Sequence, residues 1–133
     1  CNLNHEGEKA GLVVMGTDYS YISIRKENRK LILCQSVCLN ADHEGTEIEL
    51  NQIALSSMTI YLRLTVANDA MCKFSYSEDN IKFTDIENVF PAKPGKWISA
   101  KVGLFCIGNN SIIGTGFVDV DWFHVHQYIE KNL

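Results

Sequence analysis

The stretch Gly116-Phe-Val-Asp-Val-Asp-Trp-Phe-His-Val-His126 decides the fold that we expect for this chain. Its residues alternate as they do in a β-strand, where side chains two positions apart share a face. One face would carry Val118, Val120 and Trp122, and the other Phe117, Asp119, Asp121 and Phe123. Bulky side chains on both faces predict a strand buried on both sides, which we interpret as the closing strand of a β-sandwich. A buried carboxylate needs a partner, so we expect Asp121 to accept backbone N–H bonds or to bind a cation.

Short apolar or alternating runs, separated by turn residues, fill the rest of the chain. The expected strands are 12–15, 18–26, 31–39, 46–53, 58–67, 72–77, 81–86 and 97–107, with loops at 40–45, 91–95 and 108–116 and a tail at 128–133. Helical spacing is not sustained in any segment. The pattern predicts an all-β protein, an antiparallel two-sheet sandwich or a barrel. At 133 residues we expect one domain, residues 1–133, with its core over about residues 10–126.

Composition narrows the classes of partner. Apolar residues make up 46% of the chain and charged residues 21%, and the net charge is −4 from 12 basic and 16 acidic residues. The basic residues are scattered, so the sequence shows no footprint for nucleic acid. No apolar run reaches the roughly 18 residues that a membrane helix needs. The chain begins with Cys1 rather than Met, so we expect it to be a piece of a longer protein.

The five cysteines are Cys1, Cys34, Cys38, Cys72 and Cys106. Their number is odd, and no C-x-x-C pair typical of zinc or redox sites occurs. Cys34 and Cys38 would share a strand face but lie too far apart to form a disulfide within one straight strand. We therefore expect the cysteines to be small buried hydrophobes. This favours a reducing compartment such as the cytoplasm, and a periplasmic or secreted location remains the alternative.

Six blocks of sequence carry a family resemblance through their order and spacing. They are Lys9-Ala-Gly-Leu-Val-Val-Met-Gly16, Asp18-Tyr-Ser-Tyr-Ile22, Tyr61-Leu-Arg-Leu-Thr65, Cys72-Lys-Phe-Ser-Tyr-Ser77, Gly95-Lys-Trp-Ile-Ser-Ala-Lys-Val-Gly-Leu-Phe105 and Phe117-Val-Asp-Val-Asp-Trp-Phe123. From about Ala10 to His126 the chain resembles the C-terminal concanavalin A-like β-sandwich, a jelly roll, of glycoside hydrolase family 43 β-xylosidases and arabinofuranosidases. Family members have further strands before the Ala10 block, so the resemblance implies either a sandwich that is truncated at its N-terminal end or first strands that lie outside this chain.

The resemblance implies an accessory, non-catalytic domain. In that family the catalytic carboxylates lie on a separate five-bladed propeller, and the parent enzymes act on plant hemicellulose. The implied roles are to brace the propeller, to help close its active site, and to contact xylan or arabinan oligosaccharides. Two other functions stay open at this point. The chain could be a free-standing carbohydrate-binding, lectin-like module, or a small hydrolase in its own right.

The resemblance also implies two candidate sites. Trp97 lies near the place of an aromatic residue that reaches from the sandwich into the propeller's pocket in related enzymes. Asp121 matches an Asp on the last strand that holds a structural calcium ion in related sandwiches, and Asp119 is its neighbour on the same face. Calcium takes carboxylate and carbonyl oxygens from separate segments. The alternative for Asp121 is a set of backbone N–H bonds or a pairing with Lys or Arg.

Aromatic and histidine side chains suggest further sites. Tyr19, Tyr21 and Tyr61 are expected to point outward from two strands, where they could form a platform on which sugar rings stack; outward Tyr residues are also common on sheets without any ligand. His124 and His126 share a strand face. The sequence offers no identifiable third ligand, so a metal site at the two histidines is the less favoured interpretation.

Glu47 and Glu49 are the one pair of carboxylates that invites a catalytic interpretation. Residues two apart on a strand lie roughly 6.5–7 Å apart, which touches the window of roughly 6.5–9.5 Å for an inverting glycosidase. Concanavalin A-like hydrolases use an acid triplet on alternate residues, and the third position here is Asn51. We therefore expect two solvated carboxylates and no catalytic pair in this chain.

Overall fold

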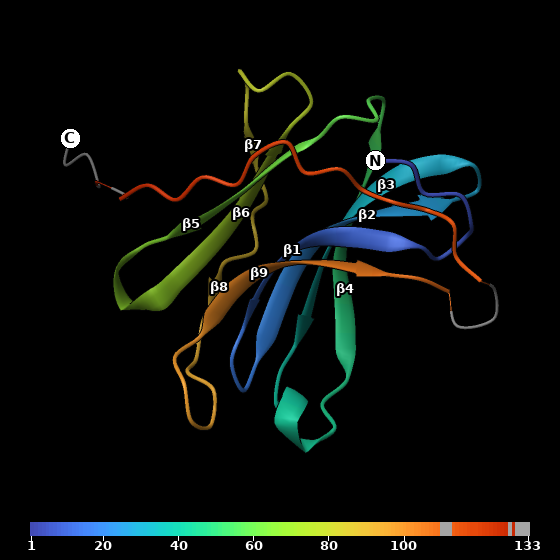
Figure 1. Cartoon of the computed structure of the whole chain (residues 1–133). Coiled ribbons are helices and arrows are strands. Elements are labelled where there is room, and N and C mark those ends of the chain that lie inside the picture. Colours follow the sequence, from blue (N-terminus) through green and yellow to red (C-terminus); the bar gives the residue numbers. More distant parts are fainter. Residues whose placement is uncertain (110–112, 128, 130–133) are drawn as a thin grey trace.

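The structure, a computed structural model, describes residues 1–109, 113–127 and 129 and consists of two antiparallel β-sheets that face each other (Figure 1). The five-stranded sheet has the order β4-β3-β2-β1-β9. Its strands are β1 (Lys9–Met15), β2 (Tyr19–Glu27), β3 (Lys30–Cys38), β4 (Glu47–Leu55) and β9 (Lys101–Ile107). Among the described residues, no helix is long and apolar enough to cross a membrane.

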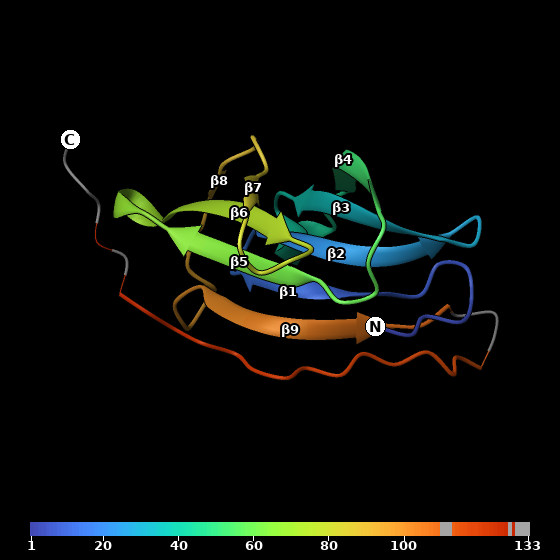
Figure 2. The same cartoon turned by 90° about the horizontal axis from the view of Figure 1, so that it is seen from above.

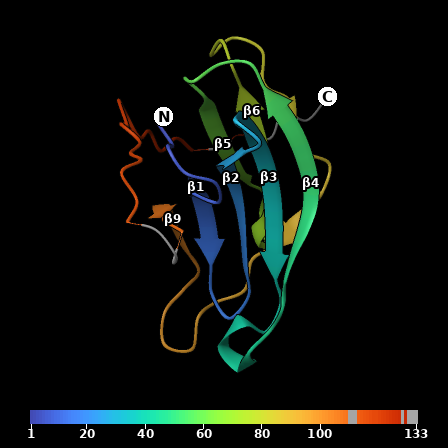
Figure 3. The same cartoon turned by 90° about the vertical axis from the view of Figure 1, so that its right-hand side faces the viewer.

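The second sheet is smaller and has the order β5-β6-β7, with β8 also paired to β6. Its strands are β5 (Tyr61–Val66), β6 (Met71–Ser77), β7 (Thr84–Asp85) and β8 (Phe90–Pro91). Two single-turn 3-10 helices occur in the connections, η1 (Ala41–His43) and η2 (Asn68–Ala70). Figure 3 shows the two sheets as separate layers, with β5 and β6 behind β1, β2 and β3.

Turn chemistry in the sequence explains the tightest hairpin. Asn28 and Arg29 join β2 to β3 and both have positive φ angles, 49° and 62°. A two-residue hairpin turn of this hand matches the right-handed twist of the flanking strands, and Asn tolerates it well. The register pairs Glu27 with Lys30 directly across the turn. The alternation of β2 is thereby fixed, with Ile22 and Ile24 facing the second sheet.

The core lies between the layers and is built from alternate positions of the strands. Its largest fully buried apolar side chains are Phe74, Ile22, Leu33 and Val14. Ile60, Leu62 and Leu64, on or just before β5, pack against this cluster, as their alternation predicts. The all-β, two-sheet, antiparallel sandwich predicted from the sequence is therefore confirmed. The strand boundaries move by a few residues, and β9 begins at Lys101 instead of Trp97.

The predicted closing strand is wrong. Residues 113–127 form an extended segment whose described strand contact is an isolated bridge from Phe117 to Asn2. Phe117, Val120, Trp122 and Phe123 are each about half exposed, so the segment is not buried on both sides. A strand needs a hydrogen-bonded neighbour, and alternation alone cannot supply one. We call residues 113–127 the C-terminal segment. The strand expected over residues 97–107 is observed as β9, which pairs with β1. In the described residues, no ladder joins β9 to the C-terminal segment.

The cysteines follow the sequence prediction in part. All five are free, and Cys34, Cys38 and Cys72 are buried. Burial raises the pKa of the Cys34 thiol to about 11, which makes it unreactive. Cys106 is exposed, so its interpretation as a buried hydrophobe is wrong. The tail predicted at 128–133 and the middle of the 108–116 loop lie outside the described residues, apart from residue 129.

Candidate functional site

One end of the sandwich gathers three loops that are far apart in the sequence. They are the β1–β2 turn around Thr17, the η1 loop, and residues 92–100 ahead of β9. Backbone hydrogen bonds join them: Thr17 N–H donates to the carbonyl of Pro94 at 3.2 Å, and Ala41 N–H donates to the carbonyl of Thr17 at 2.9 Å. A Cβ atom on Gly16 would lie 1.8 Å from the carbonyl oxygen of Lys93. Glycine is therefore required there for the loops to approach.

Asp18 is the buried centre of this loop cluster, at 2% exposure. Its carboxylate accepts the backbone N–H of Asn40 at 2.8 Å and lies 3.0 Å from the Nζ atom of Lys93. The N–H of Asn40 and the charge of Lys93 hold the pKa of Asp18 below its usual value, against the opposing effect of burial. The carboxylate is therefore ionised at neutral pH and links two loops to the β1–β2 turn.

Trp97 lies in the third of these loops and is 89% exposed. Ile98 beside it is also exposed. The loop itself is anchored at its start through Lys93 and Pro94, as described above. Exposed apolar side chains that lie next to each other can form an interaction site, and Trp is enriched among the residues that contribute most to binding at interfaces. The structure thus places Trp97 where a partner can reach it, and no described contact ties its ring to this domain.

The outer face of the five-stranded sheet carries a polar network centred on Glu47. Tyr19 and Tyr21 donate their hydroxyls to the two oxygens of Glu47 at 2.8 and 2.6 Å. Lys9 donates to the hydroxyl of Tyr21 at 2.6 Å. The rings of Tyr19 and Tyr21 are stacked at 6.2 Å, and Phe105 packs edge-on against Tyr21 at 5.0 Å. Three strands, β1, β2 and β4, are joined across this face by one carboxylate.

Neither glutamate on β4 is poised to donate a proton. Burial works to raise the pKa of Glu47, but the tyrosine hydroxyls and Lys9 outweigh it and leave the pKa lowered. Glu49 pairs with Arg25 at 2.5 Å, and its pKa is likewise lowered despite burial. A bulge in the β3–β4 ladder places Asn51 opposite Gln35. Since Gln35 is a core residue, Asn51 does not continue the outer face, and the acid triplet is missing by geometry as well as by residue type.

The structure separates the three tyrosines of the predicted platform. Tyr19 and Tyr21 lie on the five-stranded sheet, whereas Tyr61 lies on β5 and its ring is 6.0 Å from that of Trp122. Tyr21 is only 5% exposed, so its ring offers little face to a ligand. One shared platform does not form. Sugar binding by either half stays a prediction.

The acidic and histidine candidates all lie on the C-terminal segment. Asp119 and Asp121 are exposed, contrary to the expected burial, because the segment has no covering layer. The rings of Trp122 and His124 stack at 4.7 Å, with His126 edge-on to His124. Among the described residues, no three His, Cys, Asp or Glu side chains cluster closely enough to hold a metal ion. Calcium binding through Asp119 and Asp121 therefore stays a prediction.

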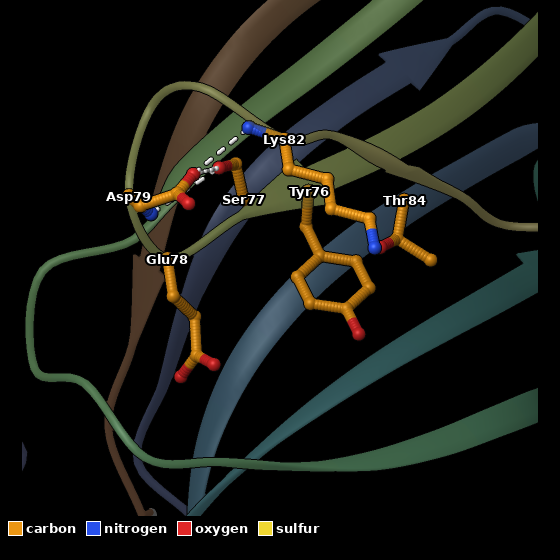
Figure 4. Close-up of a pocket in the computed structure, with 6 residues that line it drawn as sticks. All are labelled: Tyr76, Ser77, Glu78, Asp79, Lys82 and Thr84. Atoms are coloured by element: carbon orange, nitrogen blue, oxygen red, sulfur yellow. Dashed lines mark hydrogen bonds between the residues drawn. The ribbon is translucent and has the colours of Figure 1, made fainter.

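A small hollow of about 230 Å³ lies at the β6–β7 turn (Figure 4). Asp79 accepts the hydroxyl of Ser77 at 2.8 Å and the backbone N–H groups of Ile81 and Lys82 at 2.8 and 2.9 Å. These bonds are those of an Asp that closes its own turn.

Sequence reasoning missed Asp18 and Glu8 as organising residues. Glu8 is buried and accepts the backbone N–H groups of Asn4 and His5 at 2.7 and 3.1 Å. The N–H of Gly116 also points to it, at 3.4 Å. Each of the two acids directly precedes a strand, Glu8 before β1 and Asp18 before β2. This position was the signal in the sequence that could have identified them. Which backbone groups each acid serves depends on loops brought together from distant parts of the chain.

A family model described as the beta-xylosidase C-terminal concanavalin A-like domain matches residues 1–126. No curated protein and no solved structure matches the chain.

Proposed function

Because this chain belongs to the family of beta-xylosidase C-terminal concanavalin A-like domains, we propose that it packs through its Trp97 loop against the catalytic domain of a glycoside hydrolase family 43 enzyme. In this role it braces that domain and helps to close its active site. The substrate of the enzyme would be a xyloside or arabinoside of plant hemicellulose. The sandwich supplies shape and an aromatic side chain, and the catalytic domain supplies the acid and the base.

The exposure of Trp97 is the observation that carries this proposal. A Trp that is 89% exposed leaves a large apolar area in water, and removing apolar area from water is favourable by about 25 cal/mol per Å². The loop is already anchored by the Thr17–Pro94 hydrogen bond and the Asp18–Lys93 ion pair. A pre-positioned side chain loses less entropy on binding than a mobile one. Aromatic faces also suit sugar rings and exclude water.

The electrostatics of the domain support an accessory role. A glycosidase pairs a carboxylic acid of raised pKa with a carboxylate. On the outer sheet face, hydrogen bonds and cations lower the pKa of both Glu47 and Glu49. Both side chains are held ionised at neutral pH, so neither can serve as the general acid.

The experiment compares the wild-type chain with Trp97→Ala for binding to a separately produced catalytic domain from the same protein. Loss of the ring should weaken binding by at least about 30-fold, because a central aromatic contact is worth about 2 kcal/mol or more. Isothermal titration calorimetry measures the affinity, and hydrolysis of a nitrophenyl xyloside reports the effect on turnover. The melting temperature of the isolated chain should not change, since Trp97 is exposed.

Ile81→Ala is the matched control. Ile81 is 86% exposed and lies in the β6–β7 turn, at the opposite end of the sandwich from the Trp97 loop (Figure 1). Its variant should bind and support turnover as the wild type does. Equal affinity of the Trp97→Ala and wild-type chains would overturn the docking role. Micromolar binding of xylo- or arabino-oligosaccharides by the chain alone would favour a free-standing lectin-like module.

A further inference from the structure

A second group of exposed apolar side chains lies at the same end of the sandwich as Trp97. Leu39 follows β3 and is 56% exposed, and Ile48 near the start of β4 is 57% exposed. The two residues are close because their chain neighbours, Cys38 and Glu47, pair in the β3–β4 ladder. We call them the Leu39–Ile48 patch. The η1 loop joins β3 to β4 here, so the patch borders one of the three loops that form this end, which we call the loop end (Figure 3).

The backbone that carries Leu39 is fixed by hydrogen bonds and close packing. Asn40 N–H donates to the buried carboxylate of Asp18 at 2.8 Å, and Gly45 N–H donates to the carbonyl of Asn40 at 2.9 Å. A Cβ atom on Gly45 would lie 1.9 Å from the carbonyl oxygen of Leu39, so the two ends of the η1 loop touch. A surface of fixed shape loses less entropy on binding than a mobile one.

The patch and Trp97 belong to opposite edges of the five-stranded sheet. Figure 2 shows β4 and β9 at these edges, with β3, β2 and β1 between them. Neighbouring strands lie about 4.8 Å apart, so the four steps from β4 to β9 amount to about 19 Å. Trp97 lies in the loop that leads into β9. A partner that contacts Trp97 and the patch together must therefore be as wide as a folded domain.

Charged side chains of opposite sign lie beside the two apolar sites. Lys96 and Lys101 flank Trp97 in the sequence, and Glu44 lies in the η1 loop next to the patch. All three are exposed, and none of them forms an ion pair with a described residue. Complementary charge across an interface fixes its orientation. A matching partner is therefore acidic around its site for Trp97 and basic around its site for the patch.

We propose that the loop end is a two-point docking surface, on which the catalytic domain contacts Trp97 at one edge and the Leu39–Ile48 patch at the other. The contacting face of that domain carries two apolar sites about 19 Å apart, acidic beside the first and basic beside the second. This inference rests on the proposed function, because the family of beta-xylosidase C-terminal domains implies this partner. It adds a second contact and the orientation of the complex.

The first experiment measures binding of the full 133-residue chain and its variants to the separately produced catalytic domain by isothermal titration calorimetry. The double variant Leu39→Ala, Ile48→Ala should bind at least about ten-fold more weakly, because it removes apolar area that the partner covers. Ile48→Ala alone should have an intermediate affinity. Ile107→Ala is its matched control, since Ile107 is 47% exposed at the far end of the other edge strand. The control should bind as the wild type does, and all these variants should keep the wild-type melting temperature.

A second experiment tests the orientation. Lys96→Glu reverses a charge beside Trp97 and should weaken binding at least about five-fold at low salt. The loss should be smaller at high salt, because ions screen the repulsion. Lys30→Glu is the matched control, because it reverses the same charge on an exposed residue at the start of β3, at the opposite end of the sandwich. It should bind as the wild type does.

The outcomes separate this inference from the proposed function. Unchanged affinity of the Leu39→Ala, Ile48→Ala variant, together with a loss for Trp97→Ala, would overturn the second contact and leave the proposed function intact. Unchanged affinity of both variants would overturn both. Equal effects of Lys96→Glu and Lys30→Glu would show that the orientation is wrong. The inference also fails if the isolated chain sediments as a dimer that Ile48→Ala dissociates, because a second copy then covers the patch.

Discussion

Asp18 shows how a single residue can position a surface loop. Its buried carboxylate bonds the N–H of Asn40 and pairs with Lys93, whose side chain is mostly exposed. Asp18→Ala should lower the free energy of unfolding by about 2 kcal/mol, because a hydrogen bond to a charged group is worth roughly 1.5–3 kcal/mol. Lys93→Ala should cost less than about 1 kcal/mol, because an ion pair with one exposed partner is weak.

Urea unfolding followed by fluorescence measures both losses. If Lys93→Ala destabilised the chain as much as Asp18→Ala, the ion pair and not the Asn40 hydrogen bond would hold the loops. Asp18→Ala should in addition increase the rate of proteolytic cleavage within residues 92–100, since their anchor is lost.

At the scale of elements, Glu47 stabilises the outer face of the five-stranded sheet by joining β4 to β2. The hydroxyl of Tyr21 accepts from Lys9 and donates to Glu47, whereas Tyr19 bonds Glu47 and is less buried. Tyr21→Phe should therefore destabilise the protein by about 1–2 kcal/mol and Tyr19→Phe by less than about 1 kcal/mol. Thermal unfolding of the two variants checks the order, and the reverse order would contradict this account of the network.

For the whole molecule, buried and hydrogen-bonded carboxylates set the response to acid. Backbone N–H groups, first that of His5, lower the pKa of Glu8, and the N–H of Asn40 does the same for Asp18. A carboxylate with a lowered pKa in the folded state adds stability that is complete above its unfolded value of about 4 and is lost as the pH falls through the folded value. The melting temperature should be flat from pH 7 to 5 and fall steeply below about pH 4.

Differential scanning calorimetry over this pH range measures the effect. The Asp18→Ala variant should show a shallower fall than the wild type, because one of the contributing groups is gone. A wild-type melting temperature that stayed constant down to pH 3 would show that these hydrogen bonds do not contribute to stability.

Strand periodicity in the sequence is enough to predict which side chains form each face of the sheets. Alternation placed Ile22, Leu33 and Leu64 toward the core and Tyr19, Arg25 and Glu47 away from it, since strand periodicity is a local property of the chain. The residue at position 51, an Asn, by itself excludes an acid triplet on β4. The family resemblance, and not strand periodicity, pointed to Trp97 as a candidate, and only the structure showed its exposure.

Tertiary structure decided which of the alternating stretches pair. The C-terminal segment has the alternation of a strand but lacks a ladder, because pairing depends on a neighbour that sequence periodicity does not specify. The contacts of Asp18 with Asn40 and Lys93 could not be predicted either, because these residues are far apart in the sequence. The same holds for the placement of Tyr61 and Tyr19 in different sheets. Hydrogen-bond partners from remote segments are fixed only when the sheets pack, so they could be observed but not foreseen.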